Sequence, residues 1–188
     1  MLQTHCFNSP MEEIATRLQK LSLYFLSAYS GKVADSKLDL RTLFQKKQTD
    51  PALQRCQTTH KIYYYALENI LKAEVNKIEL RYKIRARNSE SGEMKLNNID
   101  ISALLKKDEF HRALYAICIE IVLVCSDSSK HFPWVLEVLE LQAIHFYKVI
   151  LSFVSIIDFF NGVRVFICSS FDDFFMTSSQ HQCFVIDS

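Results

Sequence analysis

Glu120 is the only acidic residue in an otherwise apolar stretch that runs from Leu114 to Cys125. A carboxyl group buried among apolar side chains has a raised pKa and can act as a general acid or base. Such chemistry also needs a nucleophile or a metal site close by, and the sequence arranges neither near Glu120. We therefore expect Glu120 to be structural, accepting hydrogen bonds from a neighbouring helix end or an arginine, as a buried charge must.

The other metal-binding and nucleophilic residue types are too sparse to form a site. Cys118 and Cys125 lie two helical turns apart, but two thiols without histidine or further cysteine do not make a zinc site. His111 fits a capping or core residue better than a ligand, and His181 and Cys183 stand alone. The sequence has no Gly-rich phosphate loop, G-x-S-x-G or H-E-x-x-H motif. We expect no enzyme activity, no cofactor and no metal.

His111, Cys118, Glu120 and Cys125 all lie within the segment from Asp108 to Cys125, which must form the centre of the fold. It is long enough for about five helical turns and contains neither glycine nor proline. Past Leu114, apolar residues cover nearly every face, which is typical of a helix that is buried on all sides. Asp108 is expected to be the N-cap of this helix. The residues that recur at three- and four-residue spacing are Phe110, Leu114, Ile117, Ile121 and Val124.

The composition predicts a soluble, intracellular, all-α protein. Three glycines and three prolines in 188 residues argue against a β protein with many tight turns. The net charge of +1 gives no general attraction to nucleic acid or to membranes. The longest uncharged apolar run, Val149 to Ile157, is far shorter than the roughly 20 residues of a membrane span. Six scattered cysteines without a C-x-x-C pair fit a reducing compartment.

Further helices are expected on both sides of the central one. Ser9 and Glu12 are typical of a capping box at a helix start, with Pro10 at the first helical position, and Gly31 is typical of a helix end. Asp50 followed by Pro51 predicts a second start, and an amphipathic run continues from there to Leu71. Shorter helices are expected within 32–49, over 99–105, after Pro133 and from about Gln142.

The stretch from Lys77 to Arg87 carries five basic residues and leads into a polar loop. One interpretation is a basic contact or nuclear-import patch. The other is a solvated helix end, whose cations favour the negative pole of the helix. We favour the helix end, because no aromatic platform or second basic cluster accompanies the stretch.

From Phe110 to Ile150 the sequence resembles the A-box half of the retinoblastoma-family pocket. The resemblance is carried by four motifs, with weaker echoes reaching back to residue 5: Phe110-His-Arg-Ala-Leu114, Cys118-Ile-Glu-Ile-Val-Leu123, Phe132-Pro-Trp-Val-Leu-Glu-Val-Leu139 and Phe146-Tyr-Lys-Val-Ile150. It implies a cyclin-like helical fold for residues 1–154, a nuclear location and a role in restraining cell-cycle transcription.

In that family the A box packs on a B box, and the seam between them holds the acidic, apolar activation peptide of an S-phase transcription factor. The resemblance makes Lys148 the best candidate for a cation that faces such a peptide, whereas without the resemblance an ordinary exposed lysine is the better interpretation. Val135, Leu136 and Leu139 are candidates for the adjoining apolar groove, and core burial is an equally good interpretation of these three. A lysine near the end of an apolar helix can lay its stem on a groove and offer its charge to a carboxylate.

The sequence departs from the family pattern after Phe153. Leu151 stands where the family usually has an acidic residue, and 155–188 is a Phe/Ser-rich segment unlike the pocket. Val154-Ser155 is what a common intron donor encodes when it is read in frame. We hypothesise that 155–188 is a non-family tail derived from an intron, and that the B box is missing. Sequencing the spliced transcript across codon 154 tests this hypothesis.

Three functional classes stay open at this point. The first is a retinoblastoma-type regulator with the A box only, which binds the activation peptide weakly or not at all by itself. The second is another cyclin-like adaptor, such as a cyclin-type kinase activator. The third is an inert truncated fragment. A pull-down with a separately expressed B box separates them, because reconstitution supports the first, kinase co-purification the second and insolubility the third.

Overall fold

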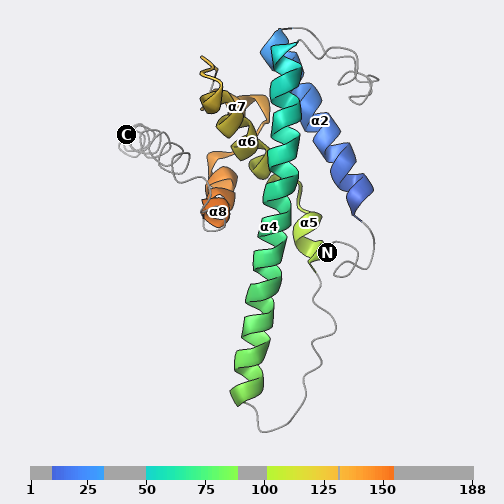
Figure 1. The fold of residues 1–188 in the computed structure, drawn as a ribbon, viewed down its shortest axis with the longest axis vertical. Coiled ribbons are helices and arrows are strands. Elements are labelled where there is room, and N and C mark those ends of the chain that lie inside the picture. Colours follow the sequence, from blue (N-terminus) through green and yellow to red (C-terminus); the bar gives the residue numbers. More distant parts are fainter. Residues whose placement is uncertain (1–9, 32–49, 89–100, 131, 155–188) are drawn as a thin grey trace, which may run out of the picture.

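The computed structural model describes residues 10–31, 50–88, 101–130 and 132–154 (Figure 1). Within these residues the chain is helical and contains no strand, so the expected all-α, cyclin-like helical domain is confirmed. The helices are α2 (Met11–Ser30), α4 (Pro51–Asn88), α5 (Ser102–Leu105), α6 (Asp108–Cys125), α7 (Trp134–Val138) and α8 (Ala143–Val154).

Helix α6 is the buried centre of the domain, with the bounds that its apolar pattern predicts. Ile117 and Ile121 in its middle are 0% and 2% exposed. Helices α4 and α8 make the most extensive contacts with α6, and α2, α5 and α7 cover the rest of it (Figure 1). Since α6 has little polar surface of its own, these surrounding helices are what keep it out of water.

The prediction that Asp108 caps α6 is wrong by one residue. Lys107 occupies the N-cap, no side chain caps the backbone there, and Asp108 is the first helical residue. The Asp108 carboxylate instead accepts a hydrogen bond from Nε of Arg112 at 2.6 Å, one turn along the helix. An acidic residue in the first turn is also stabilised by the helix dipole, so the position still favours aspartate.

The other predicted helix ends agree in part with the structure. Gly31 ends α2 in the left-handed conformation at φ 64°, as expected. The Asp50 carboxylate accepts from the backbone N–H of Ala52 at 2.9 Å, which confirms the start of α4. Pro10, however, is the N-cap of α2 rather than its first helical residue, and Ser9 lies outside the described residues.

Helix α4 is longer than the amphipathic pattern indicated. The run that was predicted to Leu71 continues without a break to Asn88, so the basic stretch forms its last turns. The placement of the basic stretch on a helix end is therefore confirmed. The short helix expected within 32–49, the loop after Asn88 and the segment 155–188 lie outside the described residues.

Candidate functional site

Glu120 is structural, as predicted. Its side chain is 4% exposed, and Oε1 accepts a hydrogen bond from the backbone N–H of Phe132 at 3.1 Å. Phe132 lies just before α7, so this hydrogen bond ties the centre of α6 to the segment that leads into α7. Because the donor is a backbone group, Glu120 holds a chain segment in place, and its low exposure keeps its carboxylate away from solvent.

His111 is also a core residue, held between three parts of the chain. It is 1% exposed, its Nε2 donates to the carbonyl oxygen of Leu105 at 2.7 Å, and its Nδ1 lies 2.6 Å from the hydroxyl of Tyr63. A carbonyl can only accept, so the neutral ring donates through Nε2 and accepts from the Tyr63 hydroxyl through Nδ1. Burial lowers the pKa of His111 and stabilises this neutral form.

Replacing His111 by leucine is expected to lower the free energy of unfolding by about 2 kcal/mol, because the buried Tyr63 hydroxyl and Leu105 carbonyl lose their partner. Urea unfolding followed by circular dichroism measures the loss. The double variant with Tyr63→Phe removes the stranded hydroxyl and should be more stable than His111→Leu alone. A double variant that is less stable than His111→Leu would contradict this account.

The cysteines of the described residues do not form a reactive or metal-binding group. Cys118 is fully buried, and desolvation raises the pKa of its thiol well above the usual range, so it stays a neutral thiol. Cys125 is free and exposed at the end of α6. Among the residues that the structure describes, no cluster of three or more His, Cys, Asp or Glu side chains is placed to hold a metal ion.

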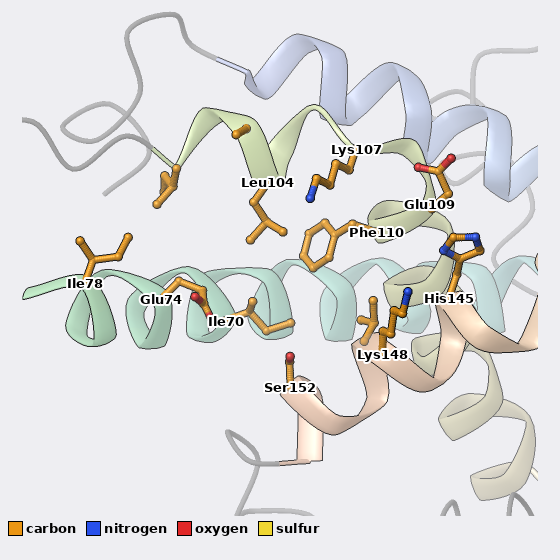
Figure 2. A pocket seen from close by; sticks show the side chains of 13 residues that line it. Ile70, Glu74, Ile78, Leu104, Lys107, Glu109, Phe110, His145, Lys148 and Ser152 are labelled. Carbon is orange, nitrogen blue, oxygen red and sulfur yellow. The ribbon is translucent and has the colours of Figure 1, made fainter. Parts of the chain in front are cut away.

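The structure separates Lys148 from the three aliphatic candidates. Val135, Leu136 and Leu139 are 1%, 6% and 1% exposed and belong to the core around α7. Lys148 is exposed on α8 and lines a hollow in the surface that none of the three reaches (Figure 2). In this conformation of the domain, Lys148 is therefore the candidate that faces open space.

The hollow around Lys148 lies between α4, α5, the start of α6, and α8 (Figure 2). Its volume is about 630 Å³, and it is open to solvent on one side. Its floor is apolar, because it is formed by Ile70, Ile101 and Phe110. These side chains lie deep in the domain and are 2%, 4% and 7% exposed. The complete lining is Ile70, Glu74, Ile78, Ile101, Ala103, Leu104, Lys107, Glu109, Phe110, His145, Lys148, Val149 and Ser152.

Two lysines, Lys107 and Lys148, and two glutamates, Glu74 and Glu109, line the hollow. Figure 2 shows Lys107 and Lys148 on opposite sides of the Phe110 ring, and the Glu109 carboxylate turned away from that ring. The Glu74 carboxylate is neutralised by Nζ of Lys77 at 2.7 Å. No carboxylate of the described residues lies within ion-pairing distance of Lys107 or Lys148. The hollow thus combines an apolar floor with two free cations.

Sequence reasoning did not identify Lys107 or the floor residues as part of a site. Lys107 lies 41 residues before Lys148, in the short link ahead of α6, and only the fold brings the two lysines to one hollow. Phe110 was predicted as a core residue, and its ring forms both core and floor. No local pattern in the sequence marks such a dual position, because it depends on how the described helices pack around Phe110.

None of the helices in the described part of the chain is long and apolar enough to cross a membrane. The sequence model for the Retinoblastoma-associated protein A domain matches residues 1–161. Retinoblastoma-like protein 1 of Homo sapiens is 31% identical over 145 residues, which make up 77% of this chain and 11% of that protein. The protein of the same name from Mus musculus is 31% identical over 148 residues, with the same coverage.

Retinoblastoma-like protein 2 of Homo sapiens is 36% identical over 75 residues, which make up 40% of this chain and 7% of that protein. The chain thus spans only a small part of the length of the relatives that it matches. The family match covers most of the chain and includes every helix that the structure describes. The chain belongs to the retinoblastoma family, a family of regulatory and non-enzymatic pocket proteins, and carries that family's A domain.

Proposed function

We propose that this chain is the A-box part of a nuclear regulator of cell-cycle transcription, and that its hollow binds acidic, apolar activation peptides of transcription factors. Membership of the retinoblastoma family supports the regulatory role. The single observation that carries the peptide-binding role is that Lys148, the cation singled out by the resemblance, lies on the rim of an open hollow with an apolar floor.

The floor of the hollow suits the apolar residues of such a peptide. The floor is formed by Ile70, Ile101 and Phe110. Most of each side chain is packed inside the domain, and the remaining part faces the hollow. A leucine or phenylalanine side chain that enters this space leaves water and contacts a rigid floor, which is how apolar anchors contribute most of the affinity at peptide interfaces. Because the floor belongs to the core, it needs little rearrangement on binding.

The rim suits the acidic residues of the same peptide. Lys107 and Lys148 offer two ammonium groups on opposite sides of the floor, and no described carboxylate neutralises them. Lysine stems can lie along the apolar surface while the charged ends reach a bound carboxylate. Two such contacts fix the position of a peptide and disfavour basic or neutral competitors.

Val135, Leu136 and Leu139 remain proposed contributors to the groove. In the structure they pack α7 against the rest of the core, with exposed fractions of 1%, 6% and 1%. Direct contact with a peptide therefore requires a shift of α7. Without that shift they support the site only by holding α7 in place.

The B box is the proposed partner of the exposed face of α8. Ile144, Tyr147 and Leu151 are 48%, 41% and 56% exposed and recur at three- and four-residue spacing on that helix. An exposed apolar stripe next to the hollow is the kind of surface that a partner domain covers. A B box placed there would close the open side of the hollow, so we expect weak peptide binding until it is present.

Lys148→Glu is expected to weaken peptide binding about tenfold, since it replaces an attraction by a repulsion at the rim. The measurement is calorimetry with an acidic, apolar activation peptide, added to the chain alone and to the chain with a separately expressed B box. Lys20→Glu on α2 makes the same change of net charge away from the hollow and should leave the affinity unchanged.

Submicromolar binding by the chain alone would contradict the need for a B box. Equal losses in Lys148→Glu and Lys20→Glu would contradict the assigned site, because a general charge effect would then explain both. Co-purification of a kinase, without any reconstitution by a B box, would favour a cyclin-type kinase activator instead.

A further inference from the structure

Helix α4 continues beyond the body of the domain. Val75 is 4% exposed, and it is the last buried residue among the α4 side chains that the structure describes, which end at Ile84. The helix nevertheless runs on to Asn88. Residues 76–88, called the α4 projection below, rise about 20 Å past Val75. Figure 1 shows this part of α4 extending past α8 and the other described helices.

The α4 projection begins at the edge of the hollow. Ile70, Glu74 and Ile78 line the hollow, and Figure 2 shows α4 crossing it from Ile70 through Glu74 to Ile78. Residues seven apart lie on nearly the same side of a helix, because seven residues make about two turns. Arg81 therefore follows Glu74 on the side of the hollow. A peptide that leaves the hollow along α4 meets the projection next.

The projection is basic and carries exposed aliphatic residues. The stretch 77–87 contains five basic residues and one acidic residue. Lys77 is paired with Glu74, but no described carboxylate lies within ion-pairing distance of Arg81 or Lys83. Leu80 and Ile84 are 59% and 50% exposed and lie one turn apart. The surface combines uncompensated positive charge with a small apolar contact area.

This combination favours an acidic peptide over other occupants. A second copy of the projection would bring like charges together. Nucleic acid would gain nothing from Leu80 and Ile84, since its affinity comes from phosphate contacts and base stacking. A membrane surface would require a wider apolar face than Leu80 and Ile84 provide, and Tyr82, the one aromatic residue in 76–88, is partly buried. An acidic segment with an aliphatic residue matches both features.

We infer that the α4 projection binds the acidic residues that flank a peptide held in the hollow, and so extends the binding site beyond the domain body. This inference rests on the proposed function, because the same peptide occupies both surfaces. Because Arg81 lies on the same side of α4 as Glu74, the hollow and the α4 projection form one continuous surface. The charge of the projection would then select peptides by their flanking sequence as well as by their core.

Fluorescence anisotropy with three labelled peptides tests the inference on the full chain mixed with a separately expressed B box. The first is an acidic, apolar core peptide, the second carries an added Glu-Glu-Leu-Glu-Glu extension, and the third carries Ser-Ser-Leu-Ser-Ser. Each extension is placed at either end in turn, because the peptide direction is not fixed. At one end, the Glu extension is expected to bind about three- to tenfold tighter than the Ser extension. High salt should remove this gain.

The variant Arg81→Glu/Lys83→Glu should lose the gain and keep the affinity for the core peptide. Both side chains are exposed, so the fold should be retained, and circular dichroism checks this. Lys20→Glu/Lys61→Glu makes the same charge change at exposed sites outside the hollow and the projection, and should retain the gain. A gain that survives Arg81→Glu/Lys83→Glu overturns the inference.

The outcomes separate the inference from the proposed function. If the core peptide binds and the Glu and Ser extensions are equivalent at both ends, the projection is not a binding surface, while the hollow stands. If only the Glu-extended peptide binds, the projection binds acidic chains and the hollow does not. If no peptide binds even with the B box present, both are wrong. Sedimentation with anionic phospholipid vesicles that requires Leu80 and Ile84 would assign the projection to a membrane instead and overturn the inference.

Discussion

Replacing Ile117 by alanine is expected to lower the free energy of unfolding by about 3 to 4 kcal/mol. Ile117 is 0% exposed in the middle of α6, where α4 and α8 pack against that helix. The substitution removes buried methyl and methylene groups and leaves a cavity that the surrounding helices can fill only in part. Urea unfolding followed by circular dichroism at 222 nm measures the loss from the shift in midpoint at constant slope.

Ile144→Ala is the matched control, since it removes the same atoms from a helix surface. Ile144 is 48% exposed on α8, so its truncation should cost less than about 1 kcal/mol. Similar losses at the two positions would show that α6 is not the buried centre of the fold. A changed slope in the Ile117→Ala variant would indicate a loosened native state rather than a simple loss of stability.

The central helix could be predicted from sequence because its pattern depends on burial alone. Apolar residues cover nearly every face of the segment past Leu114, so a helix formed there must be buried on all sides, and α6 has the predicted bounds. The N-cap was misplaced by one residue, because Asp108 suits both the N-cap and the first turn of a helix. Sequence patterns do not separate these two positions.

The length of α4 could not be read from its apolar pattern. The pattern fades after Val75, where the helix leaves the domain body and no longer needs an apolar face. From Ala52 to Asn88 the sequence contains no glycine or proline, so nothing stops the helix from continuing. The basic stretch 77–87 is therefore a helix end, as interpreted from the sequence, and it also projects from the domain body.

The candidate site shows a second limit of sequence reasoning. The resemblance singled out Lys148, and the structure places it at an open hollow. The same resemblance offered Val135, Leu136 and Leu139 as groove residues, and the structure places all three in the core. Apolar residues at helical spacing look alike whether they face a neighbouring helix or a ligand. Lys107 was not predicted at all, because its position opposite Lys148 depends on the packing of α5, α6 and α8.

A polar cluster inside the domain links α2, α4 and α6. Ser22 donates to the carbonyl oxygen of Leu18 at 2.7 Å, and lies 2.6 Å from Nε2 of His60 and 2.8 Å from the hydroxyl of Tyr115. A serine has one hydroxyl proton, so His60 Nε2 and Tyr115 both donate to the Ser22 oxygen. The neutral imidazole satisfies this arrangement, and burial lowers the pKa of His60 from 6.5 to about 4.

The domain is therefore expected to lose stability as the pH falls from about 6.5 toward 4. In this range the unfolded chain takes up a proton on His60, whereas the folded chain does not, so protonation favours unfolding. The lowered pKa of His60 is expected to reduce the free energy of unfolding by about 3 kcal/mol at pH 4. Above pH 7 this loss of stability is absent, because His60 is neutral in both the folded and the unfolded chain. The lowered pKa of His111 acts in the same direction.

His60→Gln tests how much of this pH dependence belongs to His60. Glutamine keeps an N–H group for Ser22 but does not titrate, so the variant should be less stable than the wild type at pH 7 and should approach or exceed it near pH 4. Urea unfolding at half-unit steps of pH gives both stability curves. Parallel curves for the two proteins, or an NMR titration that places the pKa of His60 near 6.5 in the folded chain, would show that α2, α4 and α6 do not enclose this histidine as the structure has it.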